Sequence, residues 1–378
     1  MDTPTTARSD FASRLYDKLA GTQAGKNLFL SPFSIRVALA MCAAGAKGET
    51  RRVLAELIGA PESVEGQNRQ YADLLKSVNG EGERPFRLVT ANALWGQQGY
   101  HFNPAYKQAV ADFYDGAFNA VNFVALPDEA VQSINAWVSD KTRGQIRGLI
   151  RRDCLDADTR LVLTNAVYFK GQWVELFDRA ATTEEDWHGP GGTSKVPMMH
   201  REGGYYHYYQ GDGFQALDMP YEGWELSMLV VLPTQKEGLT TLEPKWAAQG
   251  MYRLVTSRLH HEETVLVSLP RFKMETAFTL KPELCALGAE LAFSDHADFS
   301  GIGEEPLKIS EVIHKAFVEV NEEGTEAAAA TGVVMDTCAA PMRRPEPKVF
   351  QADHPFLFFI RDRHTKAVLF CGRVLDPK

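Results

Sequence analysis

Apolar residues in the first 150 positions recur at the spacing of helix faces. Phe11, Leu15 and Leu19 follow one another at intervals of four residues, which predicts an amphipathic helix near the start of the chain. Ser31 followed by Pro32 is typical of a helix start, because serine caps the first turn and proline fits its first position. Similar patterns predict two more helices: residues 49–57, ended by Gly59, and residues 130–141, closed by Gly144.

Later in the chain the pattern changes to that of strands. Residues 161–169 (LVLTNAVYF) form an almost continuous apolar run, which is typical of a strand buried on both faces. Further runs predict strands at residues 226–232, 264–269, 356–360 and 367–374. Helices gather early and strands late, without the regular alternation of a parallel α/β sheet. The sequence therefore favours an α+β fold.

Composition narrows the range of partners. The chain has 378 residues, of which 44% are hydrophobic, and a net charge of −9. Nucleic acids and anionic membranes attract proteins with basic faces, so we expect neither as a partner. No run approaches the ~18 uninterrupted apolar residues of a membrane helix.

The cysteines and the first residues bear on the compartment. The five cysteines are widely spaced and form no C-x-x-C pair, which predicts neither a disulfide framework nor a zinc site: Cys42, Cys154, Cys285, Cys338 and Cys371. The first twenty residues lack the basic start and apolar run of a secretory signal. We therefore expect a cytoplasmic protein, with secretion after removal of a leader left open.

Candidate enzyme motifs are weak. Residues 211–216 (GDGFQA) match the loose form of a dinucleotide-binding loop, but no strand–turn–helix pattern surrounds them, so a plain turn is favoured. His260, His261 and Glu262 begin like a zinc-protease helix, but Val265 stands where the second histidine ligand is needed. We expect no catalytic residues, no metal and no cofactor.

Residues 312–355 carry the most information about function. Every second residue from Val312 to Val320 forms one stripe, which is apolar except for His314. This period of two predicts a strand with one inward face, on which a lone histidine is expected to be a core residue. The unusual segment follows directly, at residues 321–331 (NEEGTEAAAAT).

Two interpretations of the next positions compete. Four consecutive alanines favour a helix by propensity alone. At a period of two, however, one set of positions carries no charge, namely Thr325, Ala327, Ala329, Thr331, Val333 and Met335. The other set contains Glu326 and Asp336, so the segment can serve as a strand with one buriable face. Pro341, Pro345 and Pro347 then predict an irregular, exposed connector.

These segments and their order resemble those of the serpin family. The stretch EEGTEAAAAT at residues 322–331 is similar to the hinge of inhibitory serpins. Matching motifs occur in NLFLSPFSI (residues 27–35), TNAVYFKGQW (164–173), residues 272–302 and the C-terminal HPFLFFIRDRHTKAVLFCGRVLDP. The resemblance runs from about residue 10 to the end, and it is greatest for ovalbumin-like intracellular serpins and leaderless prokaryotic ones.

The resemblance implies a fold and a mechanism. The implied fold has three β-sheets and about nine helices in a single serpin domain, residues 1–378, with an exposed reactive-centre loop at about residues 322–348. The implied function is inhibition of a serine protease, which cleaves the loop, becomes acylated and is deformed as the loop inserts into the central sheet. We expect the protein to be a monomer. We also expect it to be an inhibitor and not an enzyme. A non-inhibitory serpin and a cross-class inhibitor of cysteine proteases are the alternatives, and a hydrolase is disfavoured by the missing catalytic pattern.

The resemblance also assigns roles to residues. The hinge comprises Glu322, Glu323, Gly324, Thr325, Glu326, Ala327, Ala328, Ala329 and Ala330. The shutter, where the central strands part, comprises Ser31, Ser34, Asn165 and His314. Trp173 and Lys315 correspond to the breach, at the top of the sheet where insertion begins.

The reactive bond follows from counting along the loop. In the family it lies about 17 residues along from the first hinge glutamate, which gives Cys338–Ala339. A small uncharged residue there suits an elastase-like serine protease or a papain-like cysteine protease. Two rival positions stay open: Asp336 would suit an aspartate-specific protease, and Arg343 or Arg344 a trypsin-like one.

Overall fold

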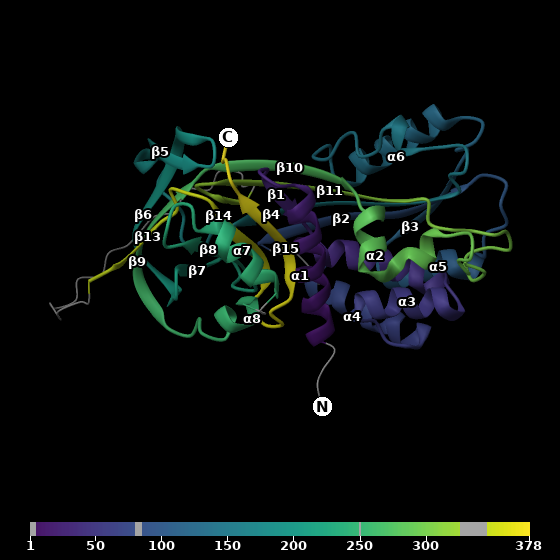
Figure 1. Cartoon of the computed structure of the whole chain (residues 1–378), viewed down its shortest axis with the longest axis horizontal. Helices are drawn as coiled ribbons and strands as arrows, with labels where there is room; N and C mark the ends of the chain where they lie inside the picture. The colour runs from purple at the N-terminus through teal and green to yellow at the C-terminus, as the bar shows by residue number, and fades with distance from the viewer. Residues whose placement is uncertain (1–4, 80–84, 249–250, 326–345) are drawn as a thin grey trace.

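A six-stranded sheet follows the long axis of the molecule (Figure 1). The computed structural model describes residues 5–79, 85–248, 251–325 and 346–378. The sheet has the order β10-β11-β12-β4-β2-β3. Its strands are β2 (Phe86–Gln97), β3 (Ala117–Val121), β4 (Leu161–Gln172), β10 (Phe272–Thr279), β11 (Glu311–Asn321) and β12 (Gly324–Thr325).

Both faces of this sheet are buried, which explains why β4 is apolar at almost every position. Leu163 and Val167 of β4 face the main hydrophobic core, whereas Val162 and Ala166 face a second cluster beneath helix α6 (Pro127–Lys141). Figure 1 shows α6 on one side of the sheet and most of the other helices on the opposite side. A strand covered on both faces needs apolar side chains of both parities.

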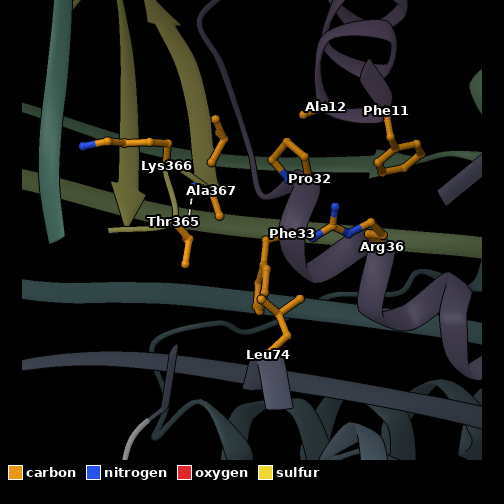
Figure 2. Close-up of a pocket in the computed structure, with 10 residues that line it drawn as sticks. Phe11, Ala12, Pro32, Phe33, Arg36, Leu74, Thr365, Lys366 and Ala367 are labelled. Carbon is orange, nitrogen blue, oxygen red and sulfur yellow. Dashed lines mark hydrogen bonds between the residues drawn. The ribbon is translucent and has the colours of Figure 1, made fainter. Parts of the chain in front are cut away.

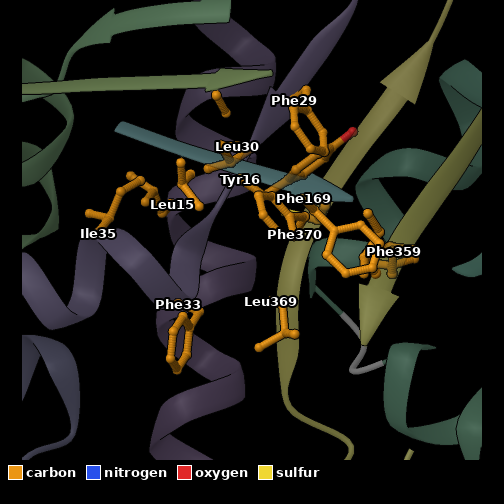
Figure 3. Packing of buried hydrophobic residues seen from close by; sticks show 14 of the residues in the cluster. Leu15, Tyr16, Phe29, Leu30, Phe33, Ile35, Phe169, Phe359, Leu369 and Phe370 are labelled. Atoms are coloured by element: carbon orange, nitrogen blue, oxygen red, sulfur yellow. The ribbon is translucent and has the colours of Figure 1, made fainter. Parts of the chain in front are cut away.

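The remaining strands form a nine-stranded sheet that packs against the first. Its order is β1-β15-β14-β8-β7-β6-β9-β13, with β5 paired to β6. Phe169 of β4 meets Phe370 of β15, and Phe370 stacks on Phe29 of β1 with ring centroids 5.2 Å apart (Figure 3). The bounds are β1 (Leu28–Leu30), β5 (Thr183–Gly189), β6 (Gly192–Gly211), β7 (Phe214–Pro220), β8 (Leu226–Pro233), β9 (Glu262–Pro270), β13 (Lys348–Gln351), β14 (Phe356–Asp362) and β15 (Val368–Val374).

The described residues form nine α-helices. Besides α6 they are α1 (Thr5–Thr22), α2 (Pro32–Gly45), α3 (Gly48–Ile58), α4 (Val64–Asn79), α5 (Pro104–Tyr114), α7 (Leu239–Ala248), α8 (Met251–Thr256) and α9 (Lys281–Leu284). Among the described residues, no helix is long and apolar enough to cross a membrane. The expected α+β fold with about nine helices is therefore confirmed.

Hydrogen bonding merges two of the three expected sheets. The first part of β6 pairs with β5 and β9, and its last residues pair with β7. One 20-residue strand thus belongs to two strand groups and joins them into the nine-stranded sheet. The third sheet of the expected fold is present as the group β5, β6, β9 and β13.

Individual expectations about helix ends are confirmed in part. The Ser31 side chain accepts a hydrogen bond from the backbone of Ser34 and caps α2, with Pro32 in the first position. Gly59 ends α3 in a left-handed conformation, with φ of 62°. The prediction for Gly144 was wrong in detail, because Thr142 caps α6 and Gly144 lies in the following turn.

The weak enzyme-like motifs have plain structural explanations. Residues 211–216 include the tight β6–β7 turn, in which Gly213 has φ of 78°. His260 and His261 are exposed and precede strand β9, so they lie on no helix. No cluster of three potential metal ligands occurs in the described part of the chain. The four described cysteines, Cys338 being outside the described residues, are free thiols.

Candidate functional site

Strands β11 and β4 pair directly over part of their length and then separate around β12. The direct pairing is parallel and runs from Glu311 opposite Val162 to Phe317 opposite Tyr168. Beyond it, Thr325 of β12 lies between Val320 on β11 and Gly171 on β4, antiparallel to both. The segment after β11 therefore turns back and enters the sheet as the first two residues of an additional strand.

Gly324 allows this re-entry. Its φ is 152°, and a Cβ built on it would lie 2.0 Å from the carbonyl oxygen of Gly171. No side chain fits at that distance, and only glycine adopts such a backbone conformation readily. The Asn321 side-chain oxygen accepts hydrogen bonds from the backbone of Glu323 (3.0 Å) and Gly324 (3.2 Å), which closes the turn.

Thr325 is fully buried, and its side chain makes one polar contact with the described residues. Its hydroxyl lies 2.8 Å from the hydroxyl of Tyr221, whose ring stacks on Trp173 at a centroid distance of 4.5 Å. Burial raises the pKa of Tyr221 against the opposing effect of the Thr325 hydrogen bond, so the phenol stays protonated. Trp173 in turn donates its indole N–H to the Asn321 carbonyl at 3.1 Å.

The two glutamates before Gly324 are held by basic groups. Glu322 accepts a hydrogen bond from Arg271 Nε at 2.6 Å and one from the Thr182 hydroxyl at 2.5 Å. Glu323 forms an ion pair with Arg179. Burial raises the pKa of Glu322, but the bonds from Arg271 and Thr182 outweigh it, so the net pKa is lowered. Glu322 is thus ionised and fastens the start of the loop at neutral pH.

A second polar group lies where β11 and β4 still pair. His314 Nδ1 donates to the Asn165 side-chain oxygen at 2.5 Å, and His314 Nε2 accepts from the Ser31 backbone N–H at 3.2 Å. Asn165 also donates its amide to Ser34 and to Asn92. These five residues, which we call the shutter network, link α2, β2, β4 and β11 inside the core.

This hydrogen-bond pattern fixes the charge of His314. Burial lowers the pKa of His314 to about 3. A proton on Nε2 would also point this nitrogen's N–H at the backbone N–H of Ser31. Two donors would then face each other without an acceptor between them. His314 is therefore neutral at physiological pH.

The structure brings together most of the predicted site residues that it describes. Ser31, Ser34, Asn165 and His314 are buried and hydrogen-bonded to one another. Trp173 lies beside the turn that leads into β12. Glu326, Ala327, Ala328, Ala329 and Ala330 lie outside the described residues, as do Cys338, Ala339, Asp336, Arg343 and Arg344.

The expected place of Lys315 was wrong. Lys315 pairs with Ala166 of β4, next to His314, and so lies beside the shutter network rather than beside Trp173. Its ammonium donates to the Arg147 carbonyl at 2.6 Å and forms an ion pair with Glu275. It therefore fastens the segment after α6 to the sheet. Lys315 follows an inward histidine in an alternating strand, which places its side chain on the α6 face.

Sequence reasoning missed three partners of the site. Asn92 completes the shutter network, Tyr221 meets Thr325, and Arg271 holds Glu322. Each contact joins residues 50 or more positions apart in the chain. No local pattern marks them, although a lone asparagine in the apolar run TANALW was a weak signal for Asn92.

Comparisons with known proteins agree with this geometry. The family model described as serpin (serine protease inhibitor) matches residues 6–377. A serpin-like protein of Thermococcus kodakarensis is 43% identical over 98% of this chain and 85% of its own length. The leukocyte elastase inhibitor A of Mus musculus is 39% identical over the full length of both proteins. The crystal structure of uncleaved ovalbumin has a TM-score of 0.88 at 30% identity and covers all of both chains.

The buried neutral His314 predicts a loss of stability in acid. Its folded pKa of about 3 lies below the ~6.5 of an unfolded histidine, so the contribution is complete above pH 6.5 and is lost as the pH falls towards 3. The slope approaches about 1.4 kcal/mol per pH unit within that window. The free energy of unfolding, measured with urea between pH 7 and pH 5, should change less with pH for His314→Gln than for the unmodified protein. The exposed His296→Gln is the control, and equal slopes for all three proteins would contradict the assignment.

A methyl group at position 324 should expel β12 from the sheet. Gly324→Ala introduces the clash with Gly171 and a strained backbone, which together cost roughly 1–3 kcal/mol. We expect a lower melting temperature and faster hydrogen exchange in the end of β4 that pairs with β12. Gly191→Ala, where a Cβ meets nothing within 4 Å, is the matched control. Unchanged exchange at Gly171 and Gln172 would show that the hinge tolerates a side chain.

Proposed function

Because the chain belongs to the serpin family, we propose that it inhibits a serine protease by trapping it with its own cleaved loop. The proposed unit is one domain over residues 1–378, with the reactive-centre loop at about residues 322–348. The protease serine attacks the carbonyl carbon of Cys338, the bond to Ala339 breaks, and the new amino terminus leaves with a proton. The acylated protease is then carried along as the freed loop inserts between β11 and β4.

The observation that carries this proposal is the position of β12. Thr325 already occupies the place between β11 and β4 that an inserting strand would extend. Insertion replaces one parallel ladder by two antiparallel ones, a net gain of about one hydrogen bond per residue. At about 0.5–1.5 kcal/mol each, a dozen residues supply on the order of 10 kcal/mol, comparable to the stability of a whole domain.

Continuation of the β12 register assigns a pair of neighbours to every inserted residue. On this register the charge-free positions of the loop face the main core, since Thr325 does so already. The pairs are Phe169 and Val318 for Ala327, Val167 and Ala316 for Ala329, Asn165 and His314 for Thr331, and Leu163 and Val312 for Val333. The other parity, which includes Glu326, faces the α6 side.

This register places polar residues opposite polar residues. Among the charge-free positions from 325 to 333, only Thr325 and Thr331 carry hydroxyls. Thr325 meets the hydroxyl of Tyr221, and Thr331 would arrive between Asn165 and His314. Insertion separates these two partners, so a hydroxyl at that level can replace the hydrogen bond that is lost. The match supports insertion as the purpose of the loop sequence.

The residues at the hinge suit a rapid event. Ala327 to Ala330 present small side chains, which can pass between strands with little steric resistance. We propose that Glu322 and Glu323, held by Arg271 and Arg179, keep the base of the hinge in place while the rest of the loop moves. In this scheme the shutter network resists opening until the loop is cut, and Trp173 marks the end of the sheet where insertion begins.

We propose an elastase-like serine protease as the target. The support is the small uncharged Cys338 at the expected reactive position and the similarity to a relative named as an inhibitor of leukocyte elastase. Inhibition of a papain-like cysteine protease would assign a different target class. Cleavage after Asp336 or Arg343 would do the same. A cytoplasmic location stays a prediction.

Cleavage should trap the protease and stabilise the inhibitor. Incubation with an elastase should give a covalent complex on a denaturing gel, and mass spectrometry should find a released peptide that begins at Ala339. Chain nicked in the loop should melt roughly 10 °C or more above intact chain, because of the hydrogen bonds gained. An elastase with a blocked catalytic serine is the control and should form no complex. A nicked chain that melts no higher would contradict insertion, and a peptide beginning at Thr337 or Arg344 would move the reactive bond.

An arginine at position 325 should turn the inhibitor into a substrate. Thr325→Arg places an unpaired charge in the buried position beside Tyr221, at a cost of roughly 3–5 kcal/mol, so insertion starts late. The acyl bond then hydrolyses first, and the stoichiometry of inhibition should rise several-fold while the rate of cleavage is unchanged. Glu326→Arg, on the opposite parity, is the matched control with the same new side chain. If both variants inhibit equally well, the parity assignment is wrong.

A further inference from the structure

A second site of interest is a pocket away from the hinge (Figure 2). Its volume is about 340 Å3, and it lies between α1, the first turn of α2, α4 and the turn that joins β14 to β15. The walls are mainly apolar, with Phe11, Phe33, Leu74 and Val368 among the lining residues. Such a pocket can accept the apolar body of a small molecule.

Arg36 is the unusual member of this lining. It is only 6% exposed, yet it has no hydrogen-bond or ion-pair partner among the residues that the structure describes, and its Nε is a buried donor without an acceptor there. Figure 2 shows its guanidinium in the middle of the ring of lining residues, directed towards Pro32 and Phe33. Lys366 points its ammonium away from the pocket, where it donates to the Arg363 carbonyl. Among the described lining residues, Arg36 is therefore the cationic group that faces the pocket.

The other two buried arginines in the described part of the chain are paired with carboxylates, which distinguishes Arg36 from them. Arg361, 2% exposed, pairs with Asp218 at 2.8 Å. Arg373, 4% exposed, pairs with Glu243 at 2.7 Å. A buried charge without a partner is costly, so an arginine kept in that state is explained by a partner from outside the chain.

We propose that this pocket binds a small amphipathic anion, with an apolar, ring-containing body and one carboxylate. The guanidinium of Arg36 would hold the carboxylate through two parallel N–H···O bonds, the geometry that this group favours. Phe11 and Phe33 would contact the ring system. The site is independent of the protease-binding loop, and the proposal does not rest on the inhibitory function.

The pocket wall includes the turn that carries part of the shutter network. Pro32 and Phe33 line the pocket, and they stand between Ser31 and Ser34. An occupant would therefore contact the first turn of α2 and bind only the folded chain. Ligand binding to the folded state alone raises the melting temperature, which gives a second readout beside the affinity.

The probe is naphthalene-2-carboxylate, and its neutral isostere naphthalene-2-carboxamide isolates the contribution of the charge. Calorimetric titration of the full chain should show the carboxylate binding roughly tenfold or more tightly than the carboxamide. Arg36→Met keeps an apolar stem of similar reach and should bring the carboxylate down to the affinity of the carboxamide. This variant should fold, because it removes an unpaired buried charge.

Two further variants complete the test. Arg52→Met removes an exposed positive charge from α3 and should leave binding unchanged. Ala12→Trp places an indole in the pocket from α1 while keeping Arg36 in the chain, and it should abolish both the heat of binding and the rise in melting temperature. Equal affinities for the two probes, or equal carboxylate binding by the Arg36→Met and unmodified chains, would overturn the proposal. Binding that survives in Ala12→Trp, or is lost in Arg52→Met, would overturn it as well.

Discussion

The parallel pairing of β11 with β4 is the constraint on which the rest of the structure depends. Both strands are buried on both faces, and they keep the same offset of 149 residues where they pair directly and on either side of β12. To admit a strand between them, the two strands would therefore move apart sideways and would not slide along each other. A strand that enters between them finds a complete set of hydrogen-bonding partners already in register.

Two polar levels interrupt the apolar interior behind these strands. The first consists of Tyr221, which lies opposite Thr325. The second consists of Asn165 and His314, which lie further along the sheet where β11 and β4 pair directly. Buried polar groups are costly unless they are paired, so each level restricts which side chain can arrive there. In the proposed insertion, apolar burial would supply a driving force and these two levels would define the register. The neutral state of His314 satisfies the same requirement, because one ring nitrogen donates a hydrogen bond and the other accepts one.

Helix α2 connects the two sites of the molecule. Its first turn carries Ser31 and Ser34 on the side of the shutter network and turns Arg36 towards the pocket. Almost every residue of this helix is buried and out of reach of solvent, so its polar side chains depend on hydrogen bonds from other elements of the fold. The serines find partners on β2, β4, β11 and β15, whereas the arginine finds none among the residues that the structure describes.

The sequence by itself determined several of the elements and the alternation of the loop. The apolar run of β4, the caps of α2 and α3 and the inward stripe of β11 follow from local spacing, and each of them was predicted. Only the tertiary structure decided which side chains meet, such as Asn92 with Asn165, Tyr221 with Thr325, and Lys315 with the segment after α6 rather than with the breach. The unpaired state of Arg36 was likewise invisible, since an arginine among apolar residues has the same local pattern with or without a partner. The physical reason is that local propensity depends on neighbours along the chain, whereas the pairing of buried polar groups depends on strands brought together from distant positions.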